Sequence, residues 1–88
     1  MANHLSAWKR MRQNERRRVR NRSVRSMVRT QIKKLLAEVE EKQVDRVQES
    51  FRMATSLLQK GASKGVLHRN TASRQISRLA RRVSALTS

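Results

Sequence analysis

A chain of 88 residues with 22 Lys and Arg, 6 Asp and Glu and no cysteine carries a formal net charge of +16. That length suits one small domain and excludes a catalytic domain beside a binding domain, and the missing cysteine excludes disulfides and thiolate metal sites. The charge predicts a polyanionic partner, because such a partner relieves the self-repulsion of the folded chain.

The charge is unevenly distributed. Residues 1–34 hold twelve bases and one acid, residues 35–60 four and five, and residues 61–88 six and none. The longest apolar run, residues 35–37, is too short for a membrane span or a signal-peptide core, so we expect no membrane partner. An Arg-rich, acid-poor start is also typical of mitochondrial transit peptides, but the stretch NERRRVRNR lacks the apolar stripe that they need.

The first predicted element is a long helix from about Ser6 to Glu41. Proline is absent and both glycines lie later in the chain, so no strong helix breaker interrupts this segment. Its second half has apolar residues at steps of three and four, which predicts one buried face. These residues are Val24, Val28, Ile32, Leu35 and Val39, widened by Met27 and Leu36.

The first half of this helix has no such face. A helix of that length would span about 54 Å, roughly twice the length of the later helices, so residues 1–22 must project beyond them. We call this segment the arm. Because it combines many like charges with no burial, we expect it to be frayed in the free protein and helical once its charge is neutralised.

The second and third helices are predicted from caps and spacing. Asp45 followed by Gln48 resembles a capping box, and Gly61 is a natural left-handed terminator after about Lys60. Asn70 is a plausible N-cap of the third helix. The expected buried faces are Val47, Phe51, Ala54, Leu57 and Leu58 in the second helix and Ala72, Ile76, Leu79, Val83 and Leu86 in the third.

Together these elements predict an all-α fold. Short connections make successive helices antiparallel, so we expect an up-down-up three-helix bundle whose long basic first helix projects as an N-terminal arm. Residues 1–88 would form a single nucleic-acid-binding domain with an arm (1–22) and a bundle (23–88).

The basic residues indicate what the polyanion is. Five of them form a ridge beside the apolar face of the first helix, at steps of four, three, four and four; we call it the ridge, and it consists of Arg18, Arg22, Arg25, Arg29 and Lys33. The arm carries further bases on other sides, and a second basic helix holds Arg69, Arg74, Arg78, Arg81 and Arg82. Sixteen of the 22 bases are arginine, whose planar fork binds phosphate oxygens in pairs.

Nothing in the sequence resembles a helix-turn-helix, a zinc finger or a zipper-linked basic region. Scarce aromatic residues with abundant arginine favour recognition of folded RNA through shape and phosphate. Two alternatives stay open: a basic protein that compacts DNA without specificity, and a cationic helix on a membrane or partner surface. The second requires an apolar face, for which the arm offers only Leu5, Trp8, Met11 and Val19.

Several stretches resemble the bacterial small-subunit ribosomal protein twenty family, in order and at its usual spacing. They are MANHLSAWKR at the start, NRSVRSMVRT at 21–30, the lysine pair at 33–34 and SKGVLHRNTASRQISRL from 63 onwards. The resemblance implies a three-helix bundle with a long first helix that binds 16S ribosomal RNA directly and early in assembly. The family contacts the 5′ domain and the long penultimate helix of that RNA, in the cytoplasmic ribosome.

Carried over to this chain, the resemblance and the charge pattern give a set of expected RNA-binding residues. Trp8 and Gln75 depart from the lysines of the family, and Thr71 and Ser73 soften a usually basic stretch, so contacts there are left open. No cofactor, small-molecule substrate or homo-oligomer is expected. The expected RNA-binding residues are Ser6, Lys9, Arg10, Arg12, Arg16, Arg17, Arg18, Arg22, Ser23, Arg25, Arg29, Thr30, Lys33, Lys64, His68, Arg69, Asn70, Arg74 and Arg78.

Two residues allow more than one interpretation. Trp8 could stack on an unpaired base or lie on a sugar-phosphate or protein surface, and His68 could bind phosphate or cap the third helix. Glu38 and Lys42 have the spacing of an i,i+4 surface pair. No nucleophile, base and metal-ligand constellation is present, so the sequence predicts that the protein is not an enzyme.

Overall fold

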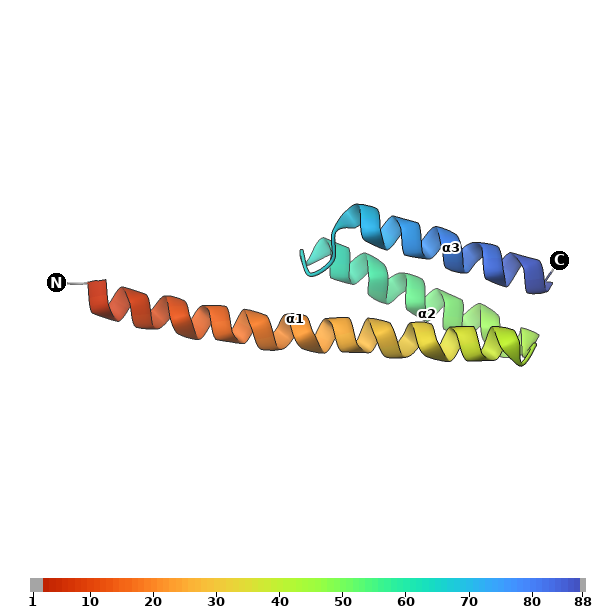
Figure 1. The fold of residues 1–88 in the computed structure, drawn as a ribbon, viewed down its shortest axis with the longest axis horizontal. Coiled ribbons are helices and arrows are strands. Elements are labelled where there is room, and N and C mark those ends of the chain that lie inside the picture. Colours follow the sequence, from red (N-terminus) through yellow and green to blue (C-terminus); the bar gives the residue numbers. More distant parts are fainter. Residues whose placement is uncertain (1–2, 88) are drawn as a thin grey trace.

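The fold is a three-helix bundle extended by one long helix. A computed structural model describes the backbone of residues 3–87 and the side chains of residues 6–87. Its helices are α1 (Asn3–Glu40), α2 (Val44–Ser63) and α3 (Arg69–Thr87), and no strand occurs within those described residues. The molecule extends 66 × 21 × 14 Å, and the first half of α1 projects past the other two helices (Figure 1). The expected all-α bundle with an arm is confirmed.

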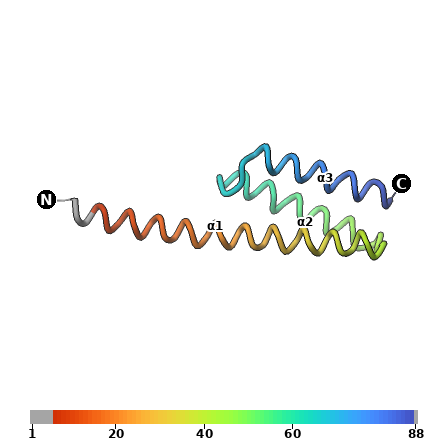
Figure 2. Tube along the Cα trace, viewed as in Figure 1, coloured from red at the N-terminus to blue at the C-terminus, as the bar shows by residue number. Residues whose placement is uncertain are grey.

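α2 is the central element of the bundle. It runs antiparallel to both α1 and α3 and packs extensively against each, whereas α1 and α3 touch each other only slightly (Figure 2). The α2–α3 turn lies where the arm leaves the bundle, and the end of α3 lies at the opposite end of the bundle, as does the α1–α2 turn. The bundle therefore holds only the second half of α1.

The core lies between these three helices. Leu35 of α1 and Val47 and Leu58 of α2 are the largest fully buried side chains. Burial of each such side chain stabilises the fold by about 1.5–3 kcal/mol. The predicted face of α3 is confirmed, since Ala72, Leu79 and Val83 are buried and Ile76 and Leu86 pack against them.

The buried face of α1 differs in part from the predicted one. Met27 is 54% exposed, whereas Gln31 and Glu38 are buried. Gln31 is accommodated because its Nε2 donates a hydrogen bond to the carbonyl oxygen of Ser50 on α2, at 3.2 Å. The expected surface pair of Glu38 with Lys42 is wrong, because Glu38 faces the interior and Lys42 lies beyond the end of α1.

The α1–α2 turn is a Schellman motif, which predicts a left-handed residue at its centre. Gln43 donates its N–H to the carbonyl of Glu38 (3.0 Å), and Lys42 donates to that of Val39 (3.1 Å). Lys42 has a φ of 57°, a conformation that costs a residue with a Cβ atom about 1–2 kcal/mol. Because this turn is so short, α2 begins at Val44, and Asp45 lies in its first turn and is not the predicted N-cap.

The α2–α3 turn repeats the motif four residues later than predicted. Gly61 is buried inside α2, and the left-handed residue is Gly65, with a φ of 77°. Gly65 donates to the carbonyl of Ala62 (3.1 Å), while Val66 and Leu67 both donate to that of Gly61 (2.9 and 3.1 Å). A Cβ at Gly61 would lie 2.9 Å from Leu67 Cδ1, so a larger residue there would require the Leu67 side chain to shift.

His68, the residue before α3, is the N-cap of that helix, in place of the predicted cap Asn70. Its carbonyl accepts the N–H of Ala72 (3.0 Å), and its Nδ1 accepts the N–H of Asn70 (3.1 Å). One of the orphan amides at the start of α3 thus has a partner. Of the two interpretations of His68, the cap is the one that the structure shows.

Candidate nucleic-acid interface

The arm is a single exposed helix. Every side chain from residue 6 to residue 20 is exposed, and Asn21 is the first that is half-buried. Val24 then meets the last turns of α2, with its Cγ1 3.7 Å from where a Cβ of Gly61 would lie. All faces of the helix over residues 6–20 are consequently open to a partner, and the bundle begins where Val24 packs.

The ridge runs from the arm onto the bundle half of α1. Arg18, Arg22, Arg25 and Arg29 surround one hollow of about 500 Å³, with Ser26 between them. Arg18 lies 2.8 Å from Glu15, and within residues 6–87 this is the ion pair that the structure shows. The remaining ridge arginines are free to bind an external anion.

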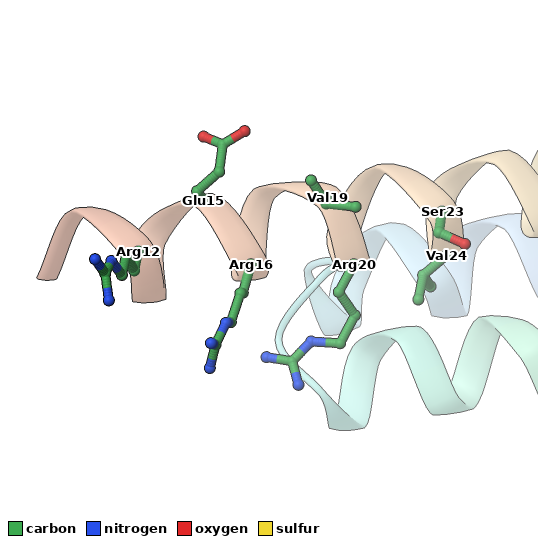
Figure 3. A pocket seen from close by; sticks show the side chains of 7 residues that line it. All are labelled: Arg12, Glu15, Arg16, Val19, Arg20, Ser23 and Val24. Carbon is green, nitrogen blue, oxygen red and sulfur yellow. The ribbon is translucent and has the colours of Figure 1, made fainter. Parts of the chain in front are cut away.

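A second basic row lies on another side of α1. Arg12, Arg16 and Arg20 are spaced by four residues, and Arg16 lies about 160° around the helix axis from Arg18 at 100° per residue. They line a hollow of about 670 Å³ together with Val19 and Val24. Figure 3 shows Arg16 and Arg20 extending from the same side of α1, away from Glu15. Arg20 was not among the expected RNA-binding residues, although the same four-residue spacing identifies it.

α3 brings further arginines next to α1. Arg78 and Arg82 line a hollow of about 200 Å³ with Leu36, Gln75 and Leu79. Arg78 was expected at the interface, whereas Arg82 was not. Since the hollow is shared by α1 and α3, positive charge borders both helices at this groove.

The structure exposes all of the expected RNA-binding residues. It brings four of the five ridge residues together around one hollow. The expected residues at the start of α3 form a separate group, because the α2–α3 turn lies between them and α1 (Figure 1). The remaining expected residues line none of the hollows described above. These residues, which are exposed outside the hollows, are Ser6, Lys9, Arg10, Arg17, Thr30, Lys33, Lys64, His68, Arg69, Asn70 and Arg74.

Neither a metal-ligand cluster nor a membrane-spanning helix occurs among the described residues. Within residues 6–87, no group of three or more His, Asp or Glu side chains could hold a metal ion. None of the three helices, as far as they are described, is long and apolar enough to cross a membrane.

The known proteins most relevant to this chain are ribosomal proteins to which it is similar in sequence. A family model described as Ribosomal protein S20 matches residues 2–84. The chain is 50% identical over 86 residues to the small ribosomal subunit protein bS20 of Geobacillus thermodenitrificans, covering 98% of this chain and 97% of that protein. It is 49% identical over 86 residues to the protein of the same name from Desulfatibacillum aliphaticivorans, with 98% of each chain covered.

These matches extend over nearly the whole chain, arm and bundle alike, and they confirm the resemblance found in the sequence. They also agree with the expectation that the protein is not an enzyme. The chain belongs to the ribosomal protein S20 family.

Proposed function

We propose that this protein is a structural component of the small ribosomal subunit that binds 16S ribosomal RNA directly and stabilises its folding during assembly. The observation that carries this proposal is the continuous row of exposed bases along α1, of which only Arg18 is paired with a carboxylate in the described part of the chain. The relatives named as small ribosomal subunit proteins support it.

The ridge suits the phosphate backbone of a folded RNA. From Arg18 to Lys33 it follows α1 for about 22 Å, at 1.5 Å per residue. Arginine forks can bind phosphate oxygens in pairs, and each phosphate neutralised releases counterions. A rigid row of this kind holds several phosphates at fixed spacing, which favours one arrangement of the RNA over others.

The arm suits a different environment. Its two basic rows lie on different sides of one helix, so a flat duplex surface would leave one of them unused. We infer that RNA surrounds the arm, and that Arg12 and Arg16 contact other phosphates than Arg18 and Arg22. The arm would then hold together RNA segments that repel each other, such as those of the 5′ domain and the long penultimate helix.

The bundle (23–88) has a supporting role in this proposal. It fixes the direction of α1 and adds the start of α3, where Lys64, Arg69, Asn70 and Arg74 are exposed close to the α2–α3 turn. His68 caps α3 and would position its exposed neighbours, whether or not it touches RNA itself. We place this complex in the ribosome of the cytoplasm.

A pair of charge-matched variants tests the ridge. One replaces Arg22, Arg29 and Lys33 by Gln, and its control replaces Arg46, Arg52 and Lys60 of the nearly neutral middle segment; all six side chains are exposed. Both variants lose three charges, so any effect of net charge is the same. Binding to transcribed 16S ribosomal RNA is titrated at several salt concentrations.

We expect the ridge variant to bind more weakly. The slope of log K against log salt, which is negative, should become shallower by about 2–3, at roughly 0.7–0.9 per lost phosphate contact. The control should keep the wild-type slope. Equal slopes for the two variants would remove the ridge from the interface. Competition with duplex DNA at 150 mM salt completes the test, since equal binding to both nucleic acids would favour the non-specific DNA-binding alternative.

A further inference from the structure

Trp8 is the one aromatic side chain that the fold leaves without a role. The chain has two aromatic residues, Trp8 and Phe51. Phe51 is half-buried and packs against the core, whereas Trp8 is 58% exposed on the arm. Its neighbour at i+3, Met11, is 65% exposed, so the two form an apolar patch on an otherwise charged helix.

The surroundings of this patch are cationic. Lys9 and Arg10 follow Trp8 in the chain, and Arg12 lies one turn further along on the same side of the helix. The nearest acid, Glu15, is held 2.8 Å from Arg18. The apolar patch therefore lies inside a field that attracts phosphate, with no unpaired carboxylate described near it.

We propose that Trp8 stacks on an unpaired base of the RNA to which the arm binds. A nucleotide is the partner that matches both properties of this surface, because it offers an aromatic face and, next to it, a phosphate for Lys9 or Arg12. A base within a continuous duplex has both faces covered by its neighbours, so the contact requires a loop, a bulge or a helix end. This inference rests on the proposed RNA-binding function and adds a base contact to a surface otherwise made for phosphates.

The chain supplies its own probe for this contact. It contains one tryptophan and no tyrosine, so its intrinsic fluorescence reports on Trp8 alone. The full-length protein is titrated at low salt with the transcribed 5′ domain of 16S ribosomal RNA and, separately, with a fully paired RNA duplex of similar length. We expect both RNAs to bind, and only the 5′ domain to quench the Trp8 emission and protect it from acrylamide.

Three variants measure the contribution to affinity. Trp8→Leu keeps an apolar side chain but loses the stacking face, and should weaken binding to the 5′ domain about 5- to 150-fold. Trp8→Phe retains a smaller ring and should restore most of that loss. Met11→Ala removes the other apolar side chain of the patch, keeps the fluorophore, and should change affinity less than about threefold.

The outcomes separate this inference from the function beneath it. If the 5′ domain binds selectively but leaves the emission unchanged, or if Trp8→Leu binds as tightly as the wild type, the stacking contact is overturned and RNA binding stands. Equal quenching by the paired duplex would also overturn it, since an unpaired base would then not be required. If the wild type shows no selectivity for the ribosomal RNA, the proposed function itself fails.

Discussion

The two halves of α1 belong to one continuous helix but are held by different forces. Residues 3–22 carry eight bases and one acid, whereas residues 23–40 carry four bases and two acids. The second half buries Val28 and Leu35 against α2 and α3, while the first half buries no side chain among residues 6–20. Identical backbone geometry thus has two origins, packing in one half and local propensity in the other.

This difference separates the half of α1 that stabilises the fold from the half that we expect to bind RNA. Most helices in proteins are stabilised by tertiary packing of an apolar face, and an isolated helix without one is marginal. The arm is also charged against the helix dipole, since its first turn contains no acid and many cations follow. Phosphates around the arm would reverse that disadvantage, so its helix and its partner should stabilise each other.

The largest contrast between the halves should appear when one apolar side chain is truncated in each. Leu35→Ala removes a fully buried side chain and should lower the free energy of unfolding by about 2–5 kcal/mol. Val19→Ala, at a residue 59% exposed on the arm, should change it by no more than about 0.5 kcal/mol. Urea unfolding followed by circular dichroism measures both, and similar losses would show that the arm is packed in solution.

A smaller effect on the free energy of unfolding is expected from changes in the two interhelical turns, which place α2 and α3 beside the second half of α1. Lys42→Gly places glycine at a left-handed position and should raise the free energy of unfolding by about 1 kcal/mol, or about 4–8 °C in Tm. Gly65→Ala should lower it by about as much, through backbone conformation alone, because no atom lies within 4 Å of the added Cβ.

Lys64→Ala is the control for this pair, since Lys64 is exposed and in the right-handed region, and its change should stay within about 0.5 kcal/mol. Thermal unfolding of the wild type and the three variants shows whether each substitution raises or lowers Tm. Shifts of the same sign for Lys42→Gly and Gly65→Ala would contradict the shared Schellman geometry.

The smallest effect on stability should follow removal of the whole arm. A chain lacking residues 1–22 should unfold cooperatively, with a free energy of unfolding within about 0.5 kcal/mol of the full chain, because no side chain among residues 6–22 is buried. Far-UV circular dichroism should show a gain of helix when the full chain binds 16S ribosomal RNA, and no gain for the shortened chain. Loss of cooperative unfolding without the arm would join the two halves into one folding unit.

Much of the fold follows from the sequence, because apolar periodicity reports directly on burial. The face of α3 is predicted residue by residue, and so is most of that of α1. The errors in α1 are Met27, which is exposed, and Gln31 and Glu38, which are buried, although nothing in α1 alone distinguishes the two polar residues from their exposed neighbours. The hydrogen bond that accommodates Gln31 comes from α2, so only the tertiary arrangement reveals it.

The exposure of the candidate interface is predictable to a similar degree. Exposure of every expected residue follows from charge and helical spacing, and the same spacing leads to Arg20. Arg82 is different, because its importance arises from the α1–α3 groove that the fold creates. The choice between Asn70 and His68 as the cap of α3 depended on which of them precedes the first helical turn, and a shift of two residues exchanges their roles.

The projecting arm also has a consequence for how fast a complex can form. The molecule is 66 Å long but at most 21 Å across, so the arm carries positive charge well beyond the bundle. Electrostatic attraction raises association rates, and so does a segment that folds on binding, as we expect of the arm. The arm should therefore make the first encounter with RNA, and docking of the bundle should follow as a second step.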